Sequence, residues 1–377
     1  MAELPSQQEL EAEGVEALKV PAELVEHERA TKSPRRRVAE VLVSLAVTVA
    51  IFAFAIPAIT GSKYSEIFDE LDILTWGQFA ALFVAWLAVM YTYTGVLTNA
   101  LRGLNHPQAL VVNFAGSAVS NVVPFGGAVG VAATYAMTMS WGFEVPAVTL
   151  AILVTGIWNV FLKLALPTIA LLILVATGSA TAGLVAPALI GLALLIAGIM
   201  ALTLILRSEQ LADRVGAVSE RAGRWLFRLV RRAPPTTWHQ AVLDFRHQSI
   251  DLLRTRWRQL TLWMIVYNAG QFALLLLCVR ALGADTHELG WIEVLAAFAF
   301  ANVLTTIAIT PSGVGFVEAG AVAALIAFGG PEAASAAAVF LFRGFTYLME
   351  IPLGAVGWLV WATKGSWRKP LGSVPPA

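Results

Sequence analysis

Eight apolar stretches dominate this chain, and each is longer than the ~20 residues with which an α-helix crosses a bilayer. Hydrophobic residues make up 58% of the 377 residues and charged residues only 13%, whereas an ordinary soluble domain has about 25% charged residues. A soluble protein of this size needs a far more polar surface. The sequence therefore predicts an all-α polytopic membrane protein and excludes a disordered chain. The apolar stretches are residues 39–60, 74–98, 109–141, 146–178, 182–206, 259–282, 291–328 and 332–362.

The charges of the polar segments predict how the chain crosses the membrane. Residues 1–37 end in a basic cluster, residues 207–258 carry eleven Arg against five acidic residues, and residues 363–377 hold three basic residues and no acid. Residues 61–73 and 283–290 have net charges of −3 and −2. Because basic segments stay on the cytoplasmic side, we predict a multi-pass protein with both termini in the cytoplasm. The 19 Arg against 6 Lys, together with the high Ala content, favour a prokaryotic inner membrane.

The basic segment 207–258 has a second property. Between residues 211 and 229 apolar side chains recur at helical spacing with Arg between them. This pattern is typical of a basic amphipathic helix that lies on an anionic membrane surface. A solvated helical hairpin packed on the rest of the protein is the alternative.

The positive-inside rule also predicts that one apolar stretch turns back within the membrane. Arg102 and Arg207 are both placed in the cytoplasm, and residues 182–206 cross once, so the chain between them crosses an odd number of further times. Residues 146–178 contain no polar turn that would let them cross twice. We therefore predict that residues 109–141 enter and leave on the cytoplasmic side, and that residues 146–178 cross once.

A second stretch has the same character. Residues 291–328 would extend about 57 Å as one straight helix at 1.5 Å per residue, which is too long for a ~30 Å hydrocarbon core. They are interrupted at Pro311, as the earlier stretch is at Pro124. We predict a second hairpin that enters from the outer side.

The two halves repeat one another. An offset of 187 residues sets Pro124 on Pro311 and Lys163 on Glu350. Inverted repeats with broken helices are typical of secondary transporters, although Pro and Gly are also simply common in membrane helices. We predict about six full spans and two Pro/Gly-broken re-entrant hairpins, arranged as an inverted repeat. The predicted parts are a cytoplasmic tail (1–37), a first membrane half (38–206) with its hairpin (109–141), the cytoplasmic insert (207–258), a second half (259–362) with its hairpin (291–328), and a cytoplasmic tail (363–377).

The breaks themselves are candidate binding elements. Each break starts a new half-helix, whose free N–H groups and positive dipole end favour a phosphate or carboxylate. Close packing of the two arms of a hairpin also needs glycine, and this is the alternative. The residues concerned are Pro124, Gly126, Gly127 and Gly130 in the first break, and Pro311, Gly313 and Gly315 in the second.

Four ionisable residues lie within apolar stretches, where charge is costly and usually functional. We predict that Arg343 and Lys163 attract an anionic head group, and that Glu318 positions the Arg or carries a proton. Two structural ion pairs that lock the halves together, with Glu350 as the fourth member, are the alternative. Four polar residues are predicted either to line a cavity that holds this head group or to act as interhelical hydrogen-bond partners. They are Asn121, Asn159, Asn302 and Tyr347.

Several other chemistries have no signature in this sequence. There is no nucleotide-binding Gly-rich loop, the five His are not at metal-ligand spacing, and the single Cys278 excludes a disulfide within the chain. We therefore expect no cofactor, no metal, no catalytic residue and no nucleic-acid partner, and a homo-oligomer is left open.

Particular motifs resemble a known family. Residues 311–319 read Pro-Ser-Gly-Val-Gly-Phe-Val-Glu-Ala, residues 341–347 read Leu-Phe-Arg-Gly-Phe-Thr-Tyr, and residues 121–127 read Asn-Val-Val-Pro-Phe-Gly-Gly. This set is similar to the flippase-like membrane domain of bacterial lysylphosphatidylglycerol synthetases, over about residues 38–362. The chain departs from this family's pattern in two places. Ala128 and Val129 stand where the family often has polar or charged residues after the first Gly-Gly pair, and Gly156 stands where it has a basic residue early in the next helix.

The resemblance implies movement of an anionic, aminoacylated or polyprenyl-phosphate-linked lipid between leaflets. Because the chain ends soon after its last apolar stretch, we expect no synthetase domain and no enzymatic activity. Three alternatives stay open: an ion-coupled transporter of a small anion, an intramembrane transferase, and a non-catalytic membrane partner of a lipid or glycan synthase.

Overall fold

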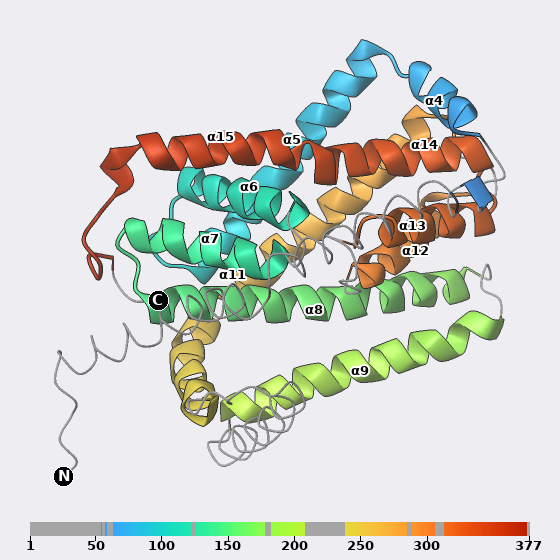
Figure 1. The fold of residues 1–377 in the computed structure, drawn as a ribbon. Coiled ribbons are helices and arrows are strands. Elements are labelled where there is room, and N and C mark those ends of the chain that lie inside the picture. The colour runs from blue at the N-terminus through green and yellow to red at the C-terminus, as the bar shows by residue number, and fades with distance from the viewer. Residues whose placement is uncertain are drawn as a thin grey trace, which may run out of the picture.

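The computed structural model is a bundle of helices, and in its described residues it contains no strand (Figure 1). It describes residues 63–122, 126–177, 182–207, 238–284, 289–305 and 313–374, and three isolated residues at positions 54, 57 and 58. The predicted spanning stretch 39–60 and the amphipathic segment 211–229 therefore lie outside the described residues, apart from those three positions. The prediction of an all-α polytopic membrane protein is confirmed.

The helices follow the apolar stretches closely. Among the described residues, four helical segments have the length and composition to cross a membrane, at Trp76–Ala100, Val145–Ala176, Arg254–Ala281 and Glu332–Thr363. The bounds are α4 (Tyr64–Asp72), α5 (Trp76–Ala100), α6 (His106–Val122), α7 (Gly126–Ser140), α8 (Val145–Ala176), α9 (Ala182–Arg207), α11 (Trp238–Ala281), α12 (Trp291–Leu304), α13 (Phe316–Ala327), α14 (Glu332–Arg343), the π-helical η3 (Gly344–Leu348), α15 (Glu350–Thr363) and the short 3-10 helix η4 (Gly365–Trp367).

Two long elements differ in detail from the expectation. The helix α11 has no break between insert and span at residues 258 and 259, because it runs unbroken from Trp238 to Ala281. The last long stretch is instead interrupted by η3, so it is not one regular α-helix. The helix α8 continues through Pro167 as a single helix of 32 residues, which agrees with one crossing.

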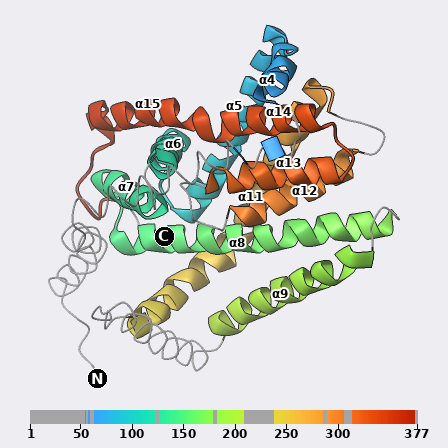
Figure 2. The same ribbon diagram turned by 45° about the vertical axis from the view of Figure 1, so that its right-hand side comes forward.

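The helix bounds recur at the offset read from the sequence. The first and last residues of α8, Val145 and Ala176, correspond at an offset of 187 to Glu332 and Thr363, the ends of the α14–α15 rod. The rod and α8 run in opposite directions on two sides of the bundle (Figures 1 and 2). Between them the α6–α7 hairpin lies toward one end and the α12–α13 hairpin toward the other. The arrangement of these helices therefore has the inverted order that the sequence predicts.

The two halves exchange their packing partners. The helix α6 of the first half packs along α15 of the second half, and α12 of the second half packs along α8 of the first. The helices α5 and α11 pack on one another between them. Each hairpin is therefore held by the long helix of the other half, which ties the halves into one bundle.

The C-terminal residues define one end of this bundle. After η4 the chain folds back, and the backbone N–H groups of Lys369 and Gly372 donate to the carbonyls of Ser140 and Gly142, at 3.2 and 3.1 Å. The indole of Trp367 packs edge-on against Trp141, with ring centroids 5.5 Å apart. The turn between α7 and α8 and the chain's C-terminal end are therefore on the same side, as the charge pattern predicts. Which side is cytoplasmic stays a prediction.

The first acidic segment and the residues that flank the second lie at the opposite end. The helix α4 occupies the acidic 61–73 segment and packs on α14, where Tyr64 stacks on Phe340 with ring centroids 6.4 Å apart. A Cβ added to Gly330, in the turn between α13 and α14, would lie 2.9 Å from Leu289, which precedes α12. The first acidic segment and the residues around the second thus share one end of the molecule.

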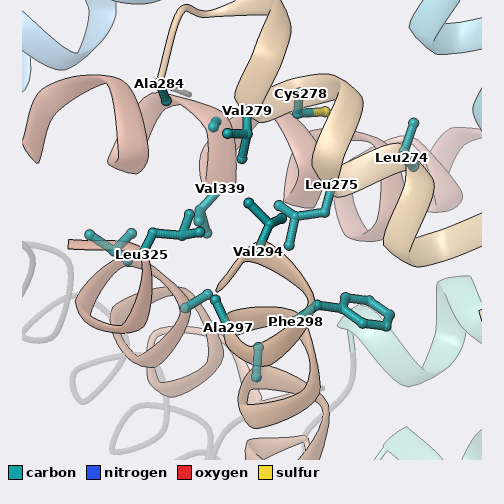
Figure 3. Close-up of a cluster of buried hydrophobic side chains, with 14 of the residues drawn as sticks. Leu274, Leu275, Cys278, Val279, Ala284, Val294, Ala297, Phe298, Leu325 and Val339 are labelled. Atoms are coloured by element: carbon teal, nitrogen blue, oxygen red, sulfur yellow. The ribbon is translucent and has the colours of Figure 1, made fainter. Parts of the chain in front are cut away.

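The apolar core consists of two clusters of buried side chains, one centred on α11–α14 and the other on α5–α8. Figure 3 shows Leu275 and Val279 of α11 facing Val294 of α12, with Leu325 of α13 and Val339 of α14 beside them. Large apolar side chains on α9 are by contrast exposed, among them Leu189, Ile190 and Leu194. A peripheral helix with apolar side chains turned outward is what a lipid-facing helix requires.

Candidate functional site

The two hairpins both reach the middle of the last long rod, where α14 ends and η3 begins. A π-helical segment inside a long helix is uncommon and is frequently found at functional sites. Around it, over residues 343–350, polar side chains from α6, α13, η3 and α15 come together. We call this group, made of Asn121, Gly315, Glu318, Arg343, Tyr347 and Glu350, the junction cluster.

An ion pair joins the second hairpin to the rod. The Oε1 atom of Glu318 lies 2.6 Å from Nε of Arg343, and the two side chains are 4% and 14% exposed. The other oxygen of Glu318, Oε2, accepts a hydrogen bond of 2.6 Å from the backbone N–H of Gly315, the N-cap of α13. One carboxylate therefore caps a helix and neutralises an arginine.

Glycine is required in this turn for a conformational reason. Gly313 and Gly315 have φ angles of 70° and 91°, in the left-handed region that side chains with a Cβ rarely adopt. The spacing Gly-x-Gly-x-x-Glu thus places a turn, an N-cap and a capping carboxylate in order. This is a structural role for both glycines, and the α13 N-terminus is occupied by the chain's own carboxylate rather than free for an anion.

Arg343 has further contacts that hold its position. Its Cζ atom lies 5.1 Å from the centroid of the Tyr347 ring, in the range of a cation–π contact. Its Nη2 atom is buried and has no hydrogen-bond partner within the described ranges.

The first hairpin reaches the same segment through reciprocal hydrogen bonds. The side-chain amide of Asn121 donates to the carbonyl of Tyr347 at 3.1 Å and to Oε2 of Glu350 at 3.4 Å. The hydroxyl of Tyr347 donates to the carbonyl of Asn121 at 2.6 Å. Glu350 is 8% exposed, and Ser117, one helical turn before Asn121, lies near its carboxyl group. These bonds join the first half to the second.

The chain matches the family model of the lysylphosphatidylglycerol synthase TM region over residues 41–354. It belongs to that family. No curated protein matches the chain. The family is one of membrane domains associated with lipid handling, and the match covers every element of the junction cluster.

Three predicted site residues of this family member lie apart from the cluster. Lys163 is half-buried and Asn159 is exposed, both on α8. Asn302 is half-buried near the end of α12, and its amide donates to the carbonyl of Phe298, four residues back, at 3.4 Å. The structure brings none of them into hydrogen-bonding contact with the junction cluster in the residues it describes.

The glycines of the first break pack within their own hairpin. A Cβ on Gly126 would overlap the backbone of Ser120, and one on Gly130 would lie 2.9 Å from the carbonyl of Gly116. Gly127 is exposed, with no atom within 4 Å of a built Cβ. Close approach of α6 and α7 therefore accounts for Gly126 and Gly130. Pro124 and Pro311 lie outside the described residues.

The ion pair has no counterpart in the first half. At the offset of 187 residues, Glu318 corresponds to Val131 and Arg343 to Gly156. The pair lies within the second half, so it does not lock the two halves together. Ser117 was not predicted from the sequence, although its spacing of four residues from Asn121 places both on one face of a helix.

The cluster has no feature of a metal site. No three His, Cys, Asp or Glu side chains come together in the part of the chain that the structure describes. Its chemistry is that of a neutral ion pair, a tyrosine hydroxyl, an amide and one further carboxyl group. Groups of this kind can fix the orientation of a polar ligand by hydrogen bonding.

Removal of the Tyr347 hydroxyl tests whether the first hairpin is held by this contact. We expect Tyr347→Phe to lower the free energy of unfolding by about 0.5–1.5 kcal/mol, because the carbonyl of Asn121 loses its donor. Thermal unfolding in detergent measures this change. The matched control is Tyr91→Phe, since Tyr91 is exposed and its ring contact with His106 is retained by phenylalanine. Equal effects of the two substitutions would contradict a role for the hydroxyl.

Proposed function

We propose that this protein moves a lipid with an anionic, aminoacylated or polyprenyl-phosphate-linked head group between membrane leaflets by alternating access. One observation carries the proposal: two hairpins from opposite ends of an inverted bundle meet in the polar junction cluster on one rod. Membership of a family of lipid-handling membrane domains supports a lipid as the cargo. On this proposal the protein is a transporter and not an enzyme.

The distribution of contacts suggests which parts move. Alternating access in inverted repeats moves one repeat relative to the other around a fixed site. The bonds from Asn121 to Tyr347 and Glu350 join different halves and are ordinary hydrogen bonds. The Glu318–Arg343 pair lies within one half and is charge-assisted, which makes it the stronger contact. We infer that the bonds between halves open and close, while the pair keeps the second half rigid.

Reconstitution tests this function directly. The protein is placed in phosphatidylcholine vesicles that carry a trace of fluorescent lipid, and an impermeant quencher reports the label that reaches the outer leaflet. We expect wild type and Arg368→Ala, a change at an exposed arginine near the C-terminus, to remove the protection of inner-leaflet label. Arg343→Ala should restore most of that protection.

Two outcomes would decide against this function. Rates for wild type at the level of protein-free vesicles, with both anionic phospholipids and polyprenyl-phosphate lipids, would overturn the proposal. Uptake of a soluble anion such as phosphate by the same vesicles, without lipid movement, would favour the small-anion transporter instead.

A further inference from the structure

Lys163 differs from the other charged residues inside the bundle. It lies near the middle of α8, a 32-residue helix with the length and composition of a span. Arg343 is paired with Glu318, and Glu350 accepts a hydrogen bond from Asn121, but Lys163 has no ion-pair partner among the described residues. The hairpin connections 123–125 and 306–312 contain no acidic residue in the sequence. An ionisable side chain at membrane depth normally pairs or faces a cavity.

The face of α8 that carries Lys163 changes character along the helix. At 3.6 residues per turn, Asn159 and Lys163 share a face with Ala170 and Leu174, further along the helix. Ala170 and Leu174 are 0% and 1% exposed and belong to the core that also contains α12. This face of α8 is therefore turned toward the interior of the bundle.

Toward the start of α8 the same face is open. Asn159 and Gly156 are exposed and Lys163 is half-buried. A Cβ added to Gly156 would meet no atom within 4 Å. The amide of Asn159, the ammonium group of Lys163 and the open space at Gly156 therefore lie on one face of α8. About two turns further along, the same face is part of the close-packed core.

The repeat shows what fills the equivalent place in the second half. Glu350, at the position that corresponds to Lys163, is almost completely buried and is held by Asn121. Arg343, at the position that corresponds to Gly156, is covered by Glu318 and Tyr347. The second half therefore supplies its own partner groups. In the described residues of the first half, no equivalent groups cover Lys163 or fill the space at Gly156.

From these observations we propose that Lys163 is the binding site for the negatively charged phosphate group of the transported lipid, with Asn159 as a neighbouring hydrogen-bond donor. This inference rests on the proposed lipid translocation and names the residue that selects an anionic head group. Arg343 is then a positioning residue, since its charge is already neutralised by Glu318.

The test compares two lipids in the vesicle assay. With fluorescent phosphatidylglycerol, we expect Lys163→Gln to slow translocation at least tenfold, and Lys163→Arg to retain most of the wild-type rate. With a fluorescent glycosyl diacylglycerol, which contains no phosphate group, the rate should change less than twofold. Lys369→Gln, at an exposed lysine near the C-terminus, is the matched control.

A second measurement does not depend on transport. Short-chain phosphatidylglycerol is titrated into the detergent-solubilised protein by calorimetry, and Lys163→Gln should weaken its binding about tenfold without lowering the thermal unfolding temperature. No stability loss is expected because the described residues provide no ion-pair partner that the substitution would leave behind.

The outcomes separate this inference from the proposed function. If Lys163→Gln translocates phosphatidylglycerol at the same rate as wild type, the inference is overturned and the proposed function is left intact. An equal loss for both lipids would also overturn it, because a role in folding or gating affects every lipid. Absence of translocation by wild type would overturn the function, and the binding titration would then decide on Lys163 by itself.

Discussion

Replacement of Arg343 by Gln is expected to lower the free energy of unfolding by about 3–5 kcal/mol and to abolish lipid translocation. Loss of one partner of a buried pair leaves the other as an uncompensated charge, and this costs more than the pair itself contributes. Here the remaining group is Glu318, which is 4% exposed and also caps α13. Its displacement would move the second hairpin, so stability and transport should fall together. Thermal unfolding in detergent and the vesicle assay measure the two effects.

The double variant Glu318→Gln with Arg343→Gln is the decisive control for this explanation. It leaves no buried charge at the site, so it should be more stable than Arg343→Gln alone, although it has one more substitution. Arg368→Gln, at an exposed arginine, should leave stability unchanged within about 0.5 kcal/mol. A double variant whose loss equals the sum of the two single losses would show that the pair is not coupled.

Replacement of Gly354 by Ala is expected to give the second large effect. Gly354 lies where α15 packs on α6, and an added Cβ would overlap the Cβ of Ala118 and lie 2.5 Å from the carbonyl of Phe114. Backbone cannot yield as a flexible side chain does, so α6 and α15 must separate. We expect a loss of about 1–3 kcal/mol or more in the free energy of unfolding, typical of overpacking. Thermal unfolding measures it.

This substitution should also slow translocation, because separation of α6 from α15 moves Asn121 away from Tyr347. The matched control is Gly77→Ala on α5, at an exposed glycine where an added Cβ meets no atom within 4 Å. It should be neutral or slightly stabilising, since alanine favours a helix over glycine. A Gly354 variant that behaves like the Gly77 variant would contradict the close packing of the two helices.

Much of the fold follows from local properties of the sequence. Hydropathy alone predicts the apolar helices, and α8 and the α14–η3–α15 rod begin and end within two residues of their apolar stretches. Two elements differ from what hydropathy predicts, and one of them has a local cause. The helix α11 extends through the polar boundary near residue 258 because no Pro or Gly interrupts the chain from Trp238 to Ala269. The π-helical segment η3 directly follows Arg343. No proline precedes it there, so the sequence gives no signal for this break in the α-helix.

The candidate site was predicted as a set of residues but not as an arrangement. The sequence identifies Glu318, Arg343, Lys163 and Glu350 as charges in an apolar setting, and this depends only on their neighbours in the chain. Whether such charges pair depends on distances between segments. Glu318 and Arg343 are 25 residues apart and pair, whereas Lys163 and Glu350, related by the repeat, do not pair within the described residues.

What the sequence by itself determined is the class of protein, the order of its helices and the repeat that relates its halves. These follow from hydropathy, charge and the positions of Pro and Gly, all of which act over a few helical turns. Only the tertiary structure decided that α6 packs on α15 and α12 on α8, and therefore that Asn121 meets Tyr347. The physical reason is that contacts between helices depend on side-chain shape and interhelical hydrogen bonds, which no periodicity along one helix encodes.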